Sequence, residues 1–215
     1  MSDAVVGAVL AGGLGSRLGG DKALAELGGE QLIARPLAAV AAAGLEAIVL
    51  AKPATELPLL DHRVVREAAQ PQHPLCGIVA ALREAGGCAI VAVACDMPFV
   101  TPRLLAALAE AREPLVMPAP GGRGHPLLAR YGPELLPELE SALAREEPLR
   151  RTVESLSPRH LGEPELARFG DPERLLFNVN DEDDLARAAH MLEAEPSGAP
   201  FARIAGKRRT DREVG

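Results

Sequence analysis

Short runs of apolar, often β-branched residues recur along this chain. Two of them, at residues 5–10 and 89–94, contain no charged or polar side chain. This is usual for strands that are buried on both faces of a parallel sheet. On this pattern we predict strands at residues 5–10, 47–51, 63–66, 89–94, 115–117 and 175–179.

Segments with helical character separate most of these strands. Thr101 is a good N-cap residue and Pro102 follows it at the first helical position. Asp181 precedes a first turn rich in acidic residues, which suits the helix dipole. We predict helices at residues 31–43, 74–84, 102–112, 132–145 and 182–192. Strands that alternate with helices indicate an α/β fold with a mostly parallel, doubly wound sheet.

The alternation is interrupted after residue 117. Residues 118–124 are rich in proline and glycine, which favours a turn, and residues 125–131 can form the second arm of a hairpin. We therefore predict a hairpin insertion in the sheet. Residues 1–195 are predicted to form one domain. Residues 196–215, which contain Pro, Gly and a short basic run, are predicted to form a mobile C-terminal tail.

Composition and charge restrict the function. The chain has 215 residues, a formal net charge of -7 and 2% aromatic residues. This argues against binding to a nucleic acid, because phosphate backbones need basic surfaces and unpaired bases need aromatic platforms. The three cysteines form no C-x-x-C pair, so we expect no zinc site and a reducing compartment. With no signal peptide or apolar span in the sequence, we expect a cytoplasmic protein that does not contact a membrane.

A glycine-rich segment at residues 10–22, directly after the first predicted strand, is the strongest functional signal. Its five glycines let the backbone approach a ligand closely, and Arg17 and Lys22 add positive charge to the N–H groups of the loop. The segment differs from a Walker A loop, which has Lys where Asp21 stands here. It differs from the dinucleotide fingerprint, whose last glycine is replaced by Leu18. We predict that it binds the phosphates of a nucleoside triphosphate.

Polar residues elsewhere in the chain complement this loop. Asp96 follows the predicted strand 89–94, at the end where open parallel sheets bind ligands, and its carboxylate suits Mg²⁺. Asn178 and Asn180 alternate with apolar neighbours, so they face the same side of the last predicted strand and can bind a metal, a phosphate or a hydroxyl. His125, after the Pro/Gly turn, can be an acid, a base, a phosphate ligand or a surface residue.

Together these motifs resemble the signature of the MobA-like nucleotidyltransferases, in the family's order, over about residues 5–192. The matching motifs are Leu10-Ala11-Gly12-Gly13, Arg17, Gly19-Gly20-Asp21-Lys22, Pro74-Leu75-Cys76-Gly77, Cys95-Asp96-Met97-Pro98, His125-Pro126 and Asn178-Val179-Asn180. The resemblance implies a three-layer Rossmann-like nucleotidyltransferase fold. It also implies Mg²⁺-dependent transfer of GMP from GTP to molybdopterin bearing molybdenum, with release of pyrophosphate.

The resemblance also assigns roles to residues. Arg17, Lys22 and Asp96 would be catalytic, with Asp96 as the Mg²⁺ ligand. The ligand-binding residues would be Leu10, Ala11, Gly12, Gly13, Lys22, Glu67, Leu75, Gly77, His125, Asn178 and Asn180. The partners that the resemblance allows are GTP or CTP, molybdopterin and proteins that mature molybdoenzymes.

Two positions depart from the family pattern. After the second predicted strand, where the family often has Asn near the base or ribose, this chain has Ala51-Lys52-Pro53. After the third, where the family often has Asp, it has Glu67. The choice between guanylyl and cytidylyl transfer therefore stays open. Transfer to another small phosphorylated acceptor and a nucleotide-binding regulator without transfer activity are further alternatives.

Overall fold

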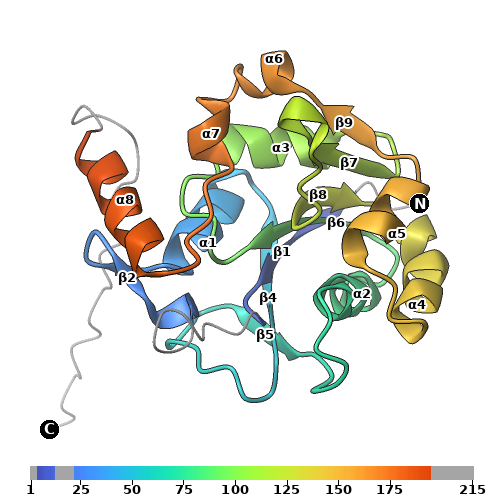
Figure 1. The fold of residues 1–215 in the computed structure, drawn as a ribbon. Helices are drawn as coiled ribbons and strands as arrows, with labels where there is room; N and C mark the ends of the chain where they lie inside the picture. Colours follow the sequence, from blue (N-terminus) through green and yellow to red (C-terminus); the bar gives the residue numbers. More distant parts are fainter. Residues whose placement is uncertain (1–3, 13–21, 195–215) are drawn as a thin grey trace, which may run out of the picture.

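A seven-stranded sheet forms the centre of the protein, with helices on both of its faces (Figure 1). The structure is a computed structural model and describes residues 4–12 and 22–194. In sheet order the strands are β5 (Arg63–Arg66), β4 (Glu46–Ala51), β1 (Val5–Leu10), β6 (Ala89–Ala94), β8 (Leu128–Tyr131), β7 (Leu115–Pro118) and β9 (Arg159–Leu161). Only β8 runs against its neighbours among these described strands, so the prediction of a mostly parallel sheet is confirmed.

Two helical layers enclose the sheet. The helices are α1 (Ala34–Ala42), α2 (Leu75–Glu84), α3 (Pro102–Glu110), α4 (Leu136–Ala144), α5 (Leu149–Ser155), α6 (Glu163–Leu166), α7 (Pro172–Leu175) and α8 (Glu182–Glu193). Val9 of β1 belongs to the core formed with α1 and α3, whereas its neighbour Ala8 belongs to the core formed with α2, α4 and α5. Successive side chains of a strand point to opposite faces, so one apolar strand serves both layers. The three-layer fold is as predicted.

The predicted hairpin insertion is present. β7 and β8 pair antiparallel, with Leu115 opposite Tyr131 and Val116 opposite Arg130. The connection between them contains a short 3-10 helix, η2 (Pro120–Gly122). Because β8 also pairs with β6, the hairpin widens the sheet beyond its parallel part.

Helix ends follow the local signals in the sequence. Thr101 Oγ1 accepts a hydrogen bond from the Leu104 N–H group, and Pro102 is the first residue of α3. At the start of α8, Asp181 Oδ1 accepts a hydrogen bond from the Asp184 N–H group at 2.9 Å. Both predicted caps are confirmed. They could be predicted from the sequence because a cap depends on residues that are neighbours in the chain.

The strand expected at residues 175–179 is absent from this described part of the chain, and that prediction is wrong. The Asp171 side chain caps the short helix α7, and Leu175 and Leu176 reach the core from this helical turn. A short apolar run can be buried from a helix end as well as from a strand. Hydrophobic pattern alone does not separate the two cases.

The first helix begins later than expected. The prediction started it at residue 31, whereas α1 starts at Ala34. A 3-10 turn, η1 (Lys22–Leu24), and a small hairpin of β2 (Glu26–Leu27) and β3 (Glu30–Gln31) occupy the preceding residues. This arrangement matters for the site because η1 begins with Lys22, the last residue of the glycine-rich segment.

The region after the large hairpin departs most from the prediction. The helix expected at residues 132–145 is a 3-10 turn, η3 (Pro133–Leu135), followed by α4. The short elements α5, β9 and α6 were not predicted. Across the described ranges, no helix is long and apolar enough to cross a membrane.

Candidate active site

The carboxyl ends of the parallel strands meet at one edge of the sheet. Leu10, the last residue of β1, is in register with Leu50 of β4 and with Ala94 of β6. The connection from β1 to β4 contains α1 on one face, and the connection that leads to β6 contains α2 on the other. The position between the ends of β1 and β6 is therefore a topological switch point, where sheets of this kind bind ligands.

Three side chains from distant parts of the chain meet at this switch point. Lys22 Nζ lies 2.8 Å from Asp96 Oδ2 and 2.9 Å from Asn180 Oδ1. Lys22 opens η1, Asp96 follows β6, and Asn180 precedes α8. The Lys22 and Asp96 side chains are 14% and 18% exposed, so a ligand can still reach both of them. The arrangement places one cation beside two oxygen ligands.

The segment that carries the two asparagines is held by backbone contacts rather than by a strand. The Val179 N–H group donates to the Asp96 carbonyl oxygen at 2.9 Å. The Asn180 N–H group donates to Asp184 Oδ2 at 2.9 Å, and Arg187 pairs with the same carboxylate. Burial would raise the pKa of Asp184, but the hydrogen bonds from Asn180 and Arg187 outweigh it and lower that pKa. Asp184 thus stays ionised and fixes the backbone of Asn180.

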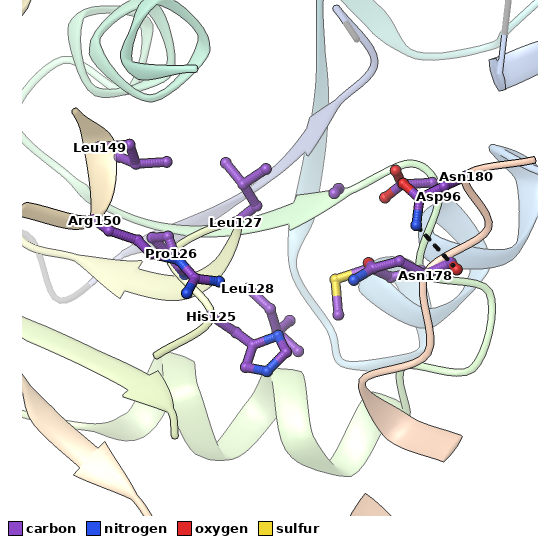
Figure 2. A pocket seen from close by; sticks show the side chains of 11 residues that line it. Asp96, His125, Pro126, Leu127, Leu128, Leu149, Arg150, Asn178 and Asn180 are labelled. Atoms are coloured by element: carbon purple, nitrogen blue, oxygen red, sulfur yellow. Dashed lines mark hydrogen bonds between the residues drawn. The ribbon is translucent and has the colours of Figure 1, made fainter. Parts of the chain in front are cut away.

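A cavity of about 340 Å³ opens beside Asp96 on the side of the hairpin, and we call it the His125 cavity. In Figure 2, His125 and Arg150 lie on one side of it, and Asp96, Asn178 and Asn180 lie on the other. The remaining lining residues are Ala94, Met97, Pro126, Leu127, Leu128 and Leu149. The cavity combines cationic and neutral polar groups with apolar walls.

The positive charge of Arg150 acts on His125, the other basic side chain of the His125 cavity. Burial lowers the pKa of His125, and the positive charges of Arg150 and Arg123 lower it further. The imidazole is therefore neutral at neutral pH, where it can donate one hydrogen bond and accept another. Arg150 supplies the permanent positive charge, and a guanidinium is well suited to a phosphate or carboxylate.

A second cavity, of about 420 Å³, lies on the other side of Asp96, and we call it the Glu67 cavity. Its polar lining includes Lys22, Lys52, Glu67, Gln70, Gln72 and His73, and its other walls are largely apolar. Ala94, Asp96 and Leu127 line both cavities. Asp96 therefore stands between two spaces that two different ligands can occupy.

Glu67 is more buried than Lys22, Lys52 and Asp96, the other charged groups of this second cavity. Glu67 is 7% exposed, and its Oε2 atom lies 3.2 Å from Lys52 Nζ. Burial raises the pKa of Glu67, while the Lys52 ammonium opposes that rise. The ion pair is thus what favours the ionised form of a carboxylate held away from water.

Gly12 is the residue that makes room for this carboxylate. A Cβ atom at position 12 would lie 2.3 Å from Glu67 Oε1, which is far inside van der Waals contact. Gly77 faces Glu67 from α2, where an added Cβ would lie 3.8 Å from Oε1. Two glycines of the sequence motifs therefore flank the buried carboxylate, and at Gly12 no other residue fits without moving it.

The residues near Asp96 fit a magnesium ion that is bound together with phosphate. Asp96 contributes a carboxylate, and Asn178 and Asn180 contribute amide groups on the same side. In protein sites Mg²⁺ often takes one or two carboxylates and completes its shell with phosphate oxygens and water. Among the residues that the structure places, no cluster of three or more His, Cys, Asp or Glu side chains forms an all-protein metal site.

Most predicted site residues that the structure describes lie around the two cavities. They are Leu10, Gly12, Lys22, Glu67, Gly77, Asp96, His125, Asn178 and Asn180. Ala11 and Leu75 lie in the core instead and line neither cavity; the Ala11 N–H group donates to Leu50 O at 2.7 Å. Gly13 and Arg17 lie outside the described residues. The binding roles of all these residues stay predictions.

Sequence reasoning missed two basic residues of the site. Arg150 belongs to α5, which was not predicted, and it reaches the cavity because Leu149 and Val153 anchor that helix in the core. In the sequence, Lys52 stands out only as a departure from the family pattern. Its position directly after a buried strand was a usable signal, because ligands bind at that edge of the sheet. Its pairing with Glu67 depends on the neighbouring strand ends and was not visible in the sequence.

Comparison with known proteins gives a consistent result. Residues 7–161 match the MobA-like NTP transferase domain. A molybdenum cofactor guanylyltransferase of Rhizobium leguminosarum bv. trifolii is 35% identical over 88% of this chain and 94% of its own length. A probable molybdenum cofactor guanylyltransferase of Pelotomaculum thermopropionicum is 32% identical over 89% of this chain and 95% of its own length.

Solved structures show the same architecture. The molybdopterin-guanine dinucleotide biosynthesis protein A of Archaeoglobus fulgidus has a TM-score of 0.75 and 26% identity, over 88% of this chain and 99% of that one. A nucleotidyl transferase from Methanothermobacter has a TM-score of 0.70 at 23% identity, over 90% of this chain and 100% of that one, which shows the shared fold alone.

Proposed function

Because the chain belongs to the MobA-like NTP transferase family, we propose that this nucleotidyltransferase transfers GMP from GTP to molybdopterin bearing molybdenum and releases pyrophosphate. The observation that carries the proposal is the position of Asp96. It lies between the Glu67 cavity and the His125 cavity and beside Lys22. A transferase needs a donor site and an acceptor site that meet at the reacting phosphorus, and these two cavities meet at Asp96.

In this proposal the Glu67 cavity holds the nucleoside of GTP. Its apolar walls suit a base and a sugar, and the Glu67 carboxylate accepts hydrogen bonds from N–H or O–H groups. A guanine presents such donors on one edge. Gly12 and Gly77 leave the room in which that carboxylate lies beside the nucleoside.

The triphosphate then extends towards the switch point. Lys22 Nζ, which lies within 3 Å of the oxygens of Asp96 and Asn180, is placed to donate to phosphate oxygens as well. Asp96, with Asn178 and Asn180 nearby, would hold Mg²⁺. When bound, the ion would neutralise phosphate charge. Arg17 and the loop amides are proposed to hold the departing pyrophosphate.

The acceptor occupies the His125 cavity. Arg150 and neutral His125 can bind its phosphate and direct one phosphate oxygen towards the α-phosphorus of GTP. That oxygen forms the new P–O bond while the bond from the α-phosphorus to the bridging oxygen breaks, and pyrophosphate leaves with the electron pair. A phosphate is already anionic, so no strong general base is needed. Catalysis is mainly positioning and charge neutralisation.

The activity can be tested with purified protein, Mg²⁺, molybdopterin bearing molybdenum and one nucleoside triphosphate at a time. We expect pyrophosphate release with GTP, dependence on the pterin, and a product whose mass has increased by one GMP. Release with CTP instead would show cytidylyl transfer. Release with a sugar phosphate in place of the pterin would show a different acceptor.

Measurements of nucleotide binding, compared with turnover, distinguish an enzyme from a nucleotide-binding regulator. At a hundred times its dissociation constant, a nucleotide stabilises the fold by about 2.7 kcal/mol, which raises the unfolding temperature of a protein this size by roughly 5–10 °C. A shift with GTP but no turnover with any acceptor would indicate a nucleotide-binding regulator. The absence of a shift with every nucleotide would overturn the proposal.

A further inference from the structure

The ammonium group of Lys52 is surrounded by three oxygen atoms. Lys52 follows β4, and its Nζ atom lies 2.7 Å from Ala68 O, 3.2 Å from Pro71 O and 3.2 Å from Glu67 Oε2. An ammonium group has three hydrogens to donate. The two backbone carbonyls accept hydrogen bonds from the ammonium, the Glu67 carboxylate is its ion-pair partner, and the side chain is only 14% exposed. Lys52 is thus placed to hold protein groups together rather than to offer its charge to a ligand.

The oxygens that Lys52 contacts belong to one wall of the Glu67 cavity. Residues 67–71 connect β5 to the segment before α2 and form neither helix nor strand. Glu67, Ala69 and Gln70 of this segment line the cavity. At its first residue the segment is joined to the sheet by a hydrogen bond from the Glu67 N–H group to Ala51 O at 3.0 Å. Beyond that point, Lys52 links it to the end of β4.

The main chain of Lys52 is fixed as well. Arg66 Nη1 donates to Lys52 O at 2.8 Å and to Thr55 O at 2.9 Å. The Thr55 N–H group donates to the same Lys52 oxygen at 3.1 Å. The Lys52 side chain therefore extends from a main chain that hydrogen bonds hold in place. A residue that positions other groups needs such support.

The position of Glu67 leaves little tolerance for movement. Its Oε1 atom lies directly against Gly12, where a Cβ atom would be only 2.3 Å away. Its Oε2 atom is buried, and its contact with Lys52 is an ion pair without the geometry of a good hydrogen bond. The carboxylate is therefore held between Gly12 on one side and the Lys52 ammonium on the other.

Building on the proposed function, we propose that Lys52 is a positioning residue for the nucleotide, which holds Glu67 and the 67–71 wall in the shape that accepts a purine nucleoside. Lys52 itself does not contact the nucleoside; it acts through Glu67. A neutral side chain of similar length at position 52 therefore weakens nucleotide binding while the reacting groups at Asp96 and Lys22 stay in place.

The charges around Glu67 predict a distinctive dependence on pH. Lys52 is the charged group in contact with its carboxylate, and Lys22, His73 and Asp96 line the same cavity further away. Burial raises the pKa of Glu67 and Lys52 opposes the rise. Loss of Lys52 raises that pKa further. A protonated carboxyl accepts hydrogen bonds poorly, so acid weakens nucleotide binding. In a variant without Lys52 this weakening should begin at a higher pH than in wild type.

The experiment compares Lys52→Met, Lys52→Arg and a matched loss of charge, Arg63→Met. Arg63 is exposed at the start of β5, pairs with Glu84 and lines neither cavity. We expect Lys52→Met to raise KM for GTP about tenfold, equivalent to about 1.4 kcal/mol, with kcat within about twofold of wild type. As the pH is lowered, KM for GTP should begin to rise in both proteins, and the rise should begin at a higher pH in Lys52→Met than in wild type. Lys52→Arg should recover most of the binding, and Arg63→Met should change neither constant.

A double-mutant cycle with Glu67→Gln tests whether Lys52 acts through the carboxylate. In the Glu67→Gln background, Lys52→Met should raise KM by much less than tenfold. Calorimetric binding of GTP to the same variants gives the comparison without turnover, and thermal unfolding shows whether each variant is folded. If Lys52→Met does not fold, Lys52→Gln, which also removes the charge but keeps a polar side chain, takes its place in the cycle.

The two proposals fail in different ways. Wild-type protein that binds GTP but releases no pyrophosphate would contradict the transfer reaction and leave the role of Lys52 standing. Unchanged GTP affinity and pH profile in Lys52→Met, or a loss of kcat at constant KM, would overturn the role of Lys52. So would an equal effect of Lys52→Met in both Glu67 backgrounds, because Lys52 would then act independently of the carboxylate.

Discussion

Lys22 Nζ lies 2.8 Å from Asp96 Oδ2, although the two residues are 74 positions apart in the sequence. The contact forms because β1 and β6 are adjacent parallel strands whose following segments meet at the switch point of the sheet. Asn180 joins the pair from the segment before α8. The group of three therefore marks the place where the Glu67 cavity and the His125 cavity meet.

Asp96 is expected to be indispensable for turnover but not for folding. Asp96→Asn should reduce kcat by about 10²–10³, the range seen when one preorganised charge-stabilising group is removed. The unfolding temperature should stay close to that of wild type, because Asp96 is partly exposed. Pyrophosphate release measures kcat, and thermal unfolding measures the stability of the variant. Asp61→Asn, at an exposed position, is the control, and near-normal turnover in Asp96→Asn would contradict the assignment.

Gly12→Ala is expected to displace the Glu67 carboxylate, since the new Cβ atom would lie 2.3 Å from Oε1. Affinity for GTP should fall by about tenfold or more, corresponding to about 1.4 kcal/mol. Adding Glu67→Asp, which shortens the side chain, should recover part of the loss. Gly162→Ala is a control because its new Cβ atom would meet nothing closer than 3.7 Å. Calorimetry with GTP measures these affinities, and equal affinity in Gly12→Ala and Gly162→Ala would refute the prediction.

Arg150→Met is expected to affect the acceptor and spare the nucleotide. Arg150 lines the His125 cavity and not the Glu67 cavity. KM for the pterin should therefore rise about tenfold or more, as when one charged contact to a phosphate is lost. KM for GTP should not change. Arg145→Met, at an exposed position after α4, serves as the control.

A nuclear magnetic resonance titration tests the same variant without turnover. The positive charge of Arg150 helps to lower the pKa of His125. Arg150→Met should therefore raise the pKa of His125 towards its ordinary value, while burial keeps it below that value. An unchanged titration curve would show that the two side chains do not interact as the structure indicates.

Asp184 is expected to make the stability of the protein sensitive to acid. Despite burial, hydrogen bonds from Asn180 and Arg187 place the pKa of Asp184 below its ordinary value. The ionised carboxylate therefore stabilises the fold above the unfolded-state pKa of about 3.9, and this contribution is lost as pH falls through the folded-state pKa. Asp184→Asn should lower the unfolding temperature at neutral pH by about 2–4 °C.

The acid dependence gives the sharper comparison. Asn at position 184 can still accept the hydrogen bond from the Asn180 N–H group but carries no titrating charge. The difference in unfolding temperature between wild type and Asp184→Asn should therefore shrink as the pH falls below about 4. Asp183→Asn, on the exposed face of α8, should show no such convergence. A difference that is constant with pH would exclude the charge as the cause.

Much of the fold was predictable because it depends on short-range features. The apolar runs at residues 5–10 and 89–94, and the short run of two valines between arginines at residues 63–66, form strands with the predicted bounds. The caps at Thr101 and Asp181 formed as expected. The run at residues 175–179 was misassigned, since burial alone does not distinguish a strand from a helix end. The core of the candidate site was predictable because Gly12 and Asp96 closely follow buried strands and Lys22 ends the glycine-rich segment after β1.

The sequence by itself therefore determined the class of fold, the edge of the sheet that carries the site and the family to which the chain is similar. These depend on hydrophobic pattern, capping and local motifs, which involve residues close together in the chain. Only the tertiary structure decided that Lys52 pairs with Glu67 beside Gly12, that Arg150 faces His125, and that two cavities meet at Asp96. Such contacts depend on the packing of strands and helices that are far apart in sequence, and no local pattern specifies them.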